Sequence, residues 1–348
     1  MSTDLYRNKG LSGLANLGNT CFINSCMQVL SHTYELNNFL ENETYKNKLK
    51  KTCESLLIIE WDNLRKLLWS SNCIVSPNKF IRTIQNISQM KDIEMFTGYS
   101  QNDLPEFLLF LVDCLHTSIS REINIKISGN PENEKDYIAI QCFDMIKNMY
   151  SKDYSEIWNM FYGVHISEIS KLETNERIKL TPEPYFMIDL PIPENIASPT
   201  LIDCFNDYVK GEIMEKENAW YDENTKEKIN IKKTILFWSF PNILVIDFKR
   251  FNNKSQKNQT LISFPVEEEL DLSKYVIGYK KEKYKYQLYG VCNHSGSVMG
   301  GHYTAYIKNA NGKWYHFNDT SVSEVGLIEN IVSTKAYVLF YRKKLDIL

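Results

Sequence analysis

Hydrophobic residues recur at helical spacing in the first third of the chain. Three stretches, 21–30, 52–69 and 103–116, carry apolar residues every three or four positions. This period predicts amphipathic helices. In the third stretch Asp103 fits a helix N-cap and Glu106 follows three residues later, as in a capping box.

From about residue 161 the pattern changes to runs of strand length. These runs are rich in β-branched or aromatic residues and are separated by glycine, proline and asparagine. They read YFMIDLPIP, TILFWSF, NILVIDFKRF, YQLYGVCNH, HYTAYIKN, KWYHFND and AYVLFYR. Helices followed by strands indicate an α+β fold, not a parallel doubly wound sheet. The polar stretches at 168–179, 210–233 and 252–260 are expected to be loops or extended hairpins.

The composition permits a large core and argues against nucleic acid and membranes as partners. The 348 residues are 43% hydrophobic, and 40 basic and 43 acidic residues give a formal net charge of -3. This balance gives no electrostatic footprint for nucleic acid or an anionic membrane. No apolar run of about 18 residues occurs, and the first residues lack the apolar core of a secretory signal. We expect a monomer in the cytoplasm or nucleus, with neither nucleic acid nor membrane as a partner.

The eight cysteines do not form a dense framework for a chain of this length. They are therefore expected to be free thiols in a reducing compartment. The sequence contains no Cys-x-x-Cys pair, so no zinc ribbon is predicted.

One cysteine stands in an unusual setting. The stretch GLANLGNTCFINSCMQVL, residues 13–30, places Cys21 after a polar, glycine-broken segment and at the start of a predicted helix. A helix N-terminus lowers a cysteine pKa, and the thiolate is the nucleophile. Asn16, Asn19 and Thr20 lie just before it, where amides and backbone N–H groups can stabilise an oxyanion. The alternative is a small buried cysteine on an amphipathic helix.

A base for such a nucleophile is expected at His302. It follows the glycine loop SGSVMGG and opens an alternating strand, and the Asn-Gly pair at 311–312 predicts a hairpin back to KWYHFND. A three-residue turn would put His302 opposite Thr320 with Asn318 diagonal to it, whereas a four-residue turn would put it opposite Asp319. Either register supplies the base and orienting group of a Cys-His-Asn/Asp triad, and the sequence does not choose between them.

These segments resemble the ubiquitin-specific proteases, the papain-like family of deubiquitinases. Residues 13–30 resemble the family's cysteine box, and residues 289–325 with the terminal AYVLFYR resemble its histidine box. GYSQNDLPEFLLFLVDCLH is similar to its Gln-x-Asp-x-x-Glu-Phe-Leu segment, and FPNILVIDFKRF to the strand that ends in Arg-Phe. The four blocks occur in the family's order over nearly the whole chain.

The resemblance implies a role for each residue. Cys21 would attack the carbonyl of ubiquitin's C-terminal glycine, and His302 would act as general base and then general acid. Asn318 matches the third triad position, with Asp319 beside it as a possible third member. Asn16 matches the oxyanion donor.

The resemblance also implies a substrate channel. Asp103 matches an acidic residue that holds the substrate's C-terminal tail, although a plain helix cap is the alternative. Gly300, Gly301 and Tyr303 would line a passage that admits only a Gly-Gly tail, although the glycines also suit an ordinary hairpin loop.

The implied architecture is a hand formed by a single catalytic domain, 1–348. The helical thumb is expected at 1–155, the β fingers, with some palm strands, at 163–238, and the palm with the histidine box at 239–348. Many members hold the fingertips together with a four-cysteine zinc site. Here KLETNERIKL and KENAWYDENTKEK lack cysteine, so we predict no cofactor and a zinc-free fingertip stabilised by strand pairing, with Trp220 and Tyr221 as candidate supports.

Three other functions compete with this interpretation. A protease for another ubiquitin-like modifier would use the same channel. An inactive ubiquitin-binding module would not require the complete triad that is present at Cys21, His302 and Asn318. A different Cys-His-Asp enzyme, such as an acyltransferase or transglutaminase, would not need the Gly-Gly-His loop.

Overall fold

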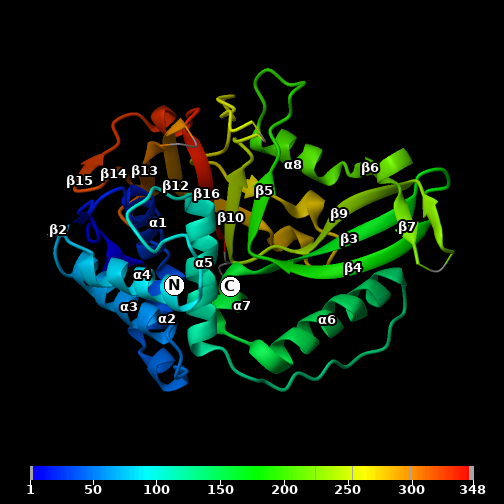
Figure 1. Ribbon diagram of the computed structural model, residues 1–348, viewed down its shortest axis with the longest axis horizontal. Coiled ribbons are helices and arrows are strands. Elements are labelled where there is room, and N and C mark those ends of the chain that lie inside the picture. Colours follow the sequence, from blue (N-terminus) through cyan, green and yellow to red (C-terminus); the bar gives the residue numbers. More distant parts are fainter. Residues whose placement is uncertain (1–2, 224, 253, 298–299, 345–348) are drawn as a thin grey trace.

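Helix α1 (Cys21–Ser31) is the element around which the amino-terminal helices assemble. All eleven of its residues are buried. The computed structural model describes residues 3–223, 225–252, 254–297 and 300–344 (Figure 1). The helix starts at Cys21, as its sequence pattern predicts.

Five further helices join α1 in the helical part. The predicted segments 52–69 and 103–116 form α3 (Ser55–Ser70) and α5 (Leu104–Ile119). The other three helices were not predicted from the sequence: α2 (Tyr34–Glu41), α4 (Asn78–Met90) and α7 (Glu156–Phe161).

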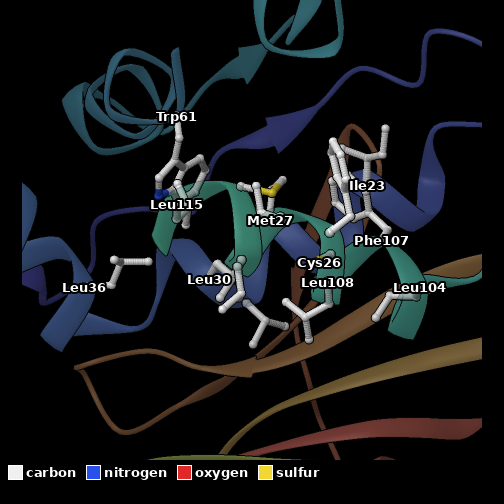
Figure 2. Packing of buried hydrophobic residues seen from close by; sticks show 14 of the residues in the cluster. Ile23, Cys26, Met27, Leu30, Leu36, Trp61, Leu104, Phe107, Leu108 and Leu115 are labelled. Carbon is white, nitrogen blue, oxygen red and sulfur yellow. The ribbon is translucent and has the colours of Figure 1, made fainter. Parts of the chain in front are cut away.

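The core of this part lies where α1 and α5 meet (Figure 2). Side chains from both helices interdigitate there with Trp61 of α3 and Leu36 of α2, which are fully buried. The burial removes a large apolar area from water and fixes α1 between the helices and the neighbouring sheet. The other labelled residues of this core are Ile23, Cys26, Met27, Leu30, Leu104, Phe107, Leu108 and Leu115.

The second part is an eight-stranded, mainly antiparallel sheet that forms the palm. Its strand order is β15-β14-β13-β12-β16-β10-β5, with β11 paired to β12, and only β10 and β5 are parallel. All six residues of β10 are buried. The strands are β5 (Met187–Leu190), β10 (Ile243–Phe248), β11 (Leu270–Asp271), β12 (Lys285–Ser297), β13 (Gly300–Lys308), β14 (Trp314–Asn318), β15 (Ser321–Glu324) and β16 (Ala336–Lys343).

Helix α1 lies directly against this sheet. A Cβ atom added to Gly290 of β12 would lie 2.5 Å from Cγ1 of Val29, so the helix approaches the strand more closely than a side chain there would allow. A short parallel pair, β1 (Gly13–Leu14) and β2 (Ile74–Val75), holds the segment that leads into the helix.

The hairpin of β13 and β14 has the first of the two registers considered from the sequence. Ala305 pairs with Phe317 and Lys308 with Trp314. The N–H of Asn309 donates to the carbonyl of Lys313, which leaves a three-residue turn. Gly312 ends this turn with φ +85°, a left-handed conformation that favours glycine.

The third part is a four-stranded sheet, β4-β3-β9-β6, that extends away from the palm as fingers (Figure 1). Helix α6 (Glu134–Asp153) packs on it through Ala139 and Cys142. The range 1–155 expected for the thumb therefore includes a helix that lies against the fingers. The strands are β3 (Gly163–Lys171), β4 (Arg177–Tyr185), β6 (Glu212–Met214) and β9 (Ile231–Ser239).

The described chain also contains six short 3-10 helices and two smaller elements. Helix α8 (Leu201–Val209) begins with a capping box formed by Thr200 and Asp203. β7 (Trp220–Asp222) and β8 (Glu227–Ile229) form a separate hairpin. Within the described part of the chain, no helix is both long and apolar enough to cross a membrane.

A carboxyl group is buried where β10 meets β5. Asp247 lies opposite Asp189 in the parallel pairing and is only 7% exposed. Burial raises the pKa of the Asp247 carboxyl well above its usual value, and the carboxylates of Asp189 and Asp103 raise it further. Asp247 therefore keeps its proton at pH values where an exposed aspartate is ionised.

Two neighbouring leucines of α5 test the position of the core. Leu108 is fully buried, whereas Leu109 is 50% exposed. Leu108→Ala leaves a cavity and should lower the free energy of unfolding by about 2–5 kcal/mol. Leu109→Ala should change it by less than about 0.5 kcal/mol. Urea unfolding measures both values, and equal losses would contradict this core.

Stability should depend on pH through Asp247. The unfolded chain ionises this group near pH 3.9, whereas the folded chain retains the proton. Above that pH the unfolded state binds fewer protons, so the stability falls as the pH rises toward the folded-state pKa. Asp247→Asn removes this titration, and its stability relative to the wild type should increase between about pH 5 and about pH 7.5. Urea unfolding across this interval measures the effect.

A matched variant controls for the loss of a carboxylate. Asp144 is exposed on α6, so Asp144→Asn removes a charge without removing a buried one. A difference between Asp247→Asn and the wild type that stays constant over the interval would show that the pKa is not raised.

Candidate active site

The candidate nucleophile lies at the junction of the helices and the palm. Cys21 is the first residue of α1 and is 3% exposed. The loop before it turns through Gly18 at φ +105° and Asn19 at φ +53°. Asn19 Nδ2 donates to the carbonyl of Tyr99 at 3.0 Å, which ties this loop to the segment before α5.

Burial controls the protonation state of the nucleophile. It raises the pKa of the Cys21 thiol, and the Asp319 carboxylate raises it further. Hydrogen bonds from the backbone of Tyr303 and from the start of α1 lower the pKa but do not overcome burial. The helix N-terminus lowers the pKa of the thiol, as predicted, but the net shift is upward because burial outweighs it. A protonated thiol needs a base at the moment of attack.

His302 lies on β13, next to the residue whose backbone contacts Cys21. Its Nε2 is 2.7 Å from Oδ1 of Asn318, the last residue of β14. An amide oxygen can only accept a hydrogen bond, so Nε2 carries the proton. This tautomer leaves a lone pair on Nδ1 for the thiol proton.

Asp319 has different partners from its neighbour Asn318. It adopts φ +49°, and its Oδ2 and Oδ1 accept hydrogen bonds from Nδ2 of Asn16 at 2.9 Å and Nδ2 of Asn24 at 2.8 Å. Its backbone carbonyl accepts from the N–H of Leu14. The carboxylate therefore connects the nucleophile loop and α1 to the end of β14.

Asn16 is fixed at both ends of its side-chain amide. Its Oδ1 accepts hydrogen bonds from the N–H groups of Gly18 and Thr20, both at 3.1 Å, while Asp319 takes one hydrogen of Nδ2. The side chain is exposed, and an amide nitrogen has a second hydrogen to donate. The arrangement can present that donor to a ligand near Cys21.

A pocket of about 390 Å³ is lined in part by Tyr303, the residue whose backbone contacts Cys21. Asp103 lines it and accepts hydrogen bonds from the hydroxyls of Tyr303 at 3.2 Å and Tyr337 at 3.1 Å. Burial raises the pKa of the Asp103 carboxyl, while these tyrosine hydrogen bonds lower it. Asp103 does occupy the N-cap position of α5, but its side chain makes no capping hydrogen bond. The side chain instead faces the pocket's tyrosines.

The two predicted channel glycines have different surroundings. A Cβ atom on Gly301 would lie 2.4 Å from Nε2 of His294, so this position has no room for a side chain. A Cβ atom on Gly300 would lie 3.7 Å from Oε1 of Gln101, an ordinary contact. Residues 298 and 299 of the preceding loop lie outside the described residues.

Sequence reasoning missed several residues of this site. Asn24 lies one helical turn after Cys21, a spacing that could have indicated it. Gln101 stands two residues before Asp103, and its amide bonds both backbone groups of Gly301. Lys257 donates to the carbonyl of His294, and no local pattern signals that contact.

The fingertip residues do not fit a zinc site. The segment 163–238 contains one thiol, Cys204, which is fully buried in α8. The described residues include no group of three or more His, Cys, Asp or Glu side chains that could hold a metal ion. Trp220 pairs with Ile229 in the β7–β8 hairpin, and Tyr221 is 50% exposed.

Comparisons with known proteins agree with this fold. Residues 12–341 match the family described as ubiquitin carboxyl-terminal hydrolase. The chain is 32% identical over 344 residues to ubiquitin carboxyl-terminal hydrolase 2 of Homo sapiens, covering 96% of this chain and 55% of that protein. It is 33% identical over 349 residues to the Gallus gallus protein of the same name, covering 96% and 93%.

A solved structure shares the architecture. The SAGA Ubp8/Sgf11/Sus1/Sgf73 DUB module bound to ubiquitin aldehyde matches with a TM-score of 0.73 and 25% identity, covering 99% of this chain and 72% of that one. The predicted α+β hand of the papain-like type is confirmed. The chain spans about half the length of the mammalian relatives it matches. From the family match and these relatives, the chain belongs to the ubiquitin carboxyl-terminal hydrolase family, as a ubiquitin-specific protease.

Proposed function

We propose that this chain is a deubiquitinating cysteine protease that hydrolyses the peptide or isopeptide bond after the C-terminal glycine of ubiquitin. The observation that carries the proposal is the His302–Asn318 contact of 2.7 Å on the strand whose backbone also bonds Cys21. It supplies a nucleophile, a base in the required tautomer and an orienting group at one place.

The first half of the reaction forms an acyl-enzyme. Nδ1 of His302 takes the thiol proton as the sulfur of Cys21 attacks the glycine carbonyl carbon. The carbonyl oxygen becomes an oxyanion, to which Nδ2 of Asn16 donates its second hydrogen. The tetrahedral intermediate then collapses. His302 returns its proton to the leaving amine, and the glycine remains attached as a thioester.

The second half restores the enzyme. His302 takes a proton from water, the resulting hydroxide attacks the thioester carbonyl, and the sulfur of Cys21 leaves and regains the proton. The products are free ubiquitin with a C-terminal carboxylate and the released amine. Because burial raises the pKa of the Cys21 thiol, proton transfer to His302 is part of the attack.

The pocket lined in part by Tyr303 supports recognition of an extended Gly-Gly tail. In this proposal Asp103 and Tyr303 form one wall, and Gly300 and Gly301 form the approach to His302. A side chain at position 301 would collide with His294, so the approach is kept narrow. A protease for another modifier with a Gly-Gly tail is the second candidate, because the same pocket would accept that tail.

The proposal includes a metal-free mechanism and a zinc-free fingertip. The support is that cysteine is missing from the fingertip and that Cys204, the one thiol between residues 163 and 238, is fully buried. All eight cysteines are free thiols, which suits a reducing compartment such as the cytoplasm or nucleus.

Release of a fluorophore from the C-terminus of ubiquitin tests the activity. The wild type should be active, and Cys21→Ala should be inactive because it lacks the nucleophile. Cys73→Ala should retain activity because that thiol is exposed and has no role in the proposed reaction. A chelator should leave the rate unchanged, and tag-free protein should contain no stoichiometric zinc.

Other results would redirect the proposal. An inactive wild type that still binds ubiquitin would indicate a binding module. An inactive wild type that does not bind ubiquitin would favour another ubiquitin-like modifier, tested with the corresponding fluorogenic substrates. Stoichiometric zinc would overturn the zinc-free fingertip.

A double-mutant cycle separates the roles of Asn318 and Asp319. Asn16→Ala should lower kcat about 100- to 1,000-fold by removing an oxyanion donor. Asp319→Ala should cause a similar loss because it frees the Asn16 amide, and the combined variant should be little worse than either single one. Asn318→Ala acts through His302, so in the combination with Asn16→Ala the two reductions in kcat should multiply. If the kcat losses of Asp319→Ala and Asn16→Ala multiplied in the combined variant, Asp319 would act independently of Asn16.

A further inference from the structure

The segment that leads into α5 contacts β13 at two points. Nε2 of Gln101 donates to the carbonyl of Gly301 at 2.5 Å, and the N–H of Gly301 donates to Oε1 of Gln101 at 2.7 Å. Two residues later, Asp103 accepts the hydroxyl hydrogen of Tyr303. The two residues on either side of His302 are therefore both held by the helical part of the molecule.

The spacing of these contacts has a simple geometric cause. Residues i and i+2 of an extended chain point to the same side. Asp103 has the extended values φ -75° and ψ 136°, and Gly301 and Tyr303 are likewise two apart on a strand. The side chains of Gln101 and Asp103 can thus both reach the same strand, Gln101 at the backbone of Gly301 and Asp103 at the hydroxyl of Tyr303.

Among the described residues, no strand pairs with the backbone of Gly301 on the side that faces Gln101. Both of its polar groups bond the Gln101 amide, and in an antiparallel ladder the N–H and C=O of one residue point to the same side. They therefore point away from β12, with which Gly301 is aligned at Gly296. The pairing of β13 with β14 ends at Ala305.

We propose that Gln101 is a positioning residue: its amide takes the place of a strand at Gly301 and holds the start of β13, and with it His302, in register with Cys21. This inference rests on the proposed function for its activity readout. A glutamine amide suits the task because it offers a donor and an acceptor at one end, as a peptide group does. Glutamate keeps only the acceptor, and leucine has neither.

The variants Gln101→Leu and Gln101→Glu test this role. Loss of the two hydrogen bonds between Gln101 and Gly301 should displace His302. Gln101→Leu should therefore lower kcat about 10- to 100-fold through misplacement of the base. KM should change little, because the proposed role is to align the base and not to bind substrate. Gln101→Glu should lie between the wild type and Gln101→Leu.

Gln85→Leu is the matched control. The Gln85 amide also donates to a backbone carbonyl, that of Gly98, but this contact stays within the helical part. It should leave kcat and KM unchanged. Thermal unfolding of all variants checks that each is folded.

Alkylation of Cys21 by iodoacetamide gives a readout that does not depend on ubiquitin. Gln101→Leu should slow alkylation at neutral pH, because the imidazole no longer assists the thiol, and Gln85→Leu should not. A wild type that is inactive on ubiquitin would contradict the proposed function. The alkylation rate of Cys21 would still test the role of Gln101 in that case.

Three results would overturn the role. A raised KM with unchanged kcat would make Gln101 a substrate contact. A raised kcat would make it a latch that restrains the free enzyme. An unchanged alkylation rate and unchanged kinetics in Gln101→Leu would show that β12 alone positions His302.

Discussion

The burial of α1 between α5 and the palm sheet is the constraint on which the rest of the site depends. Every residue of this helix is buried, and Gly290 lets it lie directly against β12. Its first residue is Cys21, so the packing that stabilises the fold also sets the position of the sulfur. Buried interiors are close-packed, which leaves the nucleophile little freedom to move.

This placement has an electrostatic consequence. Cys21 is only 3% exposed, so its thiol is costly to ionise, and the helix N–H groups and the backbone of Tyr303 only partly offset that cost. In the proposed mechanism the site therefore depends on His302 as a base rather than on a stored thiolate. The contacts that orient the base and the oxyanion donor then become the sensitive parts. Asn318 fixes the tautomer of His302, and Asp319 fixes the amide of Asn16.

Three connections join the helices to the palm around the nucleophile. Asp319 reaches Asn16 and Asn24, Gln101 reaches Gly301, and Asp103 reaches the tyrosine hydroxyls. The contacts of Asn24, Gln101 and Asp103 are partly buried, where a lost hydrogen-bond partner is costly, whereas the Asn16–Asp319 contact is exposed. These contacts hold the helical part against the palm.

Local patterns were sufficient to predict the helix at Cys21 and the hairpin that carries His302. The helix has an apolar stripe, and an Asn-Gly turn limits the possible registers to two. The choice between Asn318 and Asp319 was not available, because it depends on the turn length and on the left-handed backbone of Asp319. For Asp103 the sequence left a helix cap and a substrate contact open, and for Cys21 the helix end predicted a lowered thiol pKa. Tertiary contacts and burial outweighed the local helix-end effects on which those predictions rested.

The most direct test of the account is the site of covalent capture by ubiquitin that carries a C-terminal electrophile. Intact-mass analysis should show one ubiquitin added per chain, and peptide mapping should place the bond on Cys21. Cys21→Ala should form no adduct. An adduct on another of the eight cysteines, or none with folded wild-type protein, would contradict the assignment of Cys21 as the nucleophile of a ubiquitin protease.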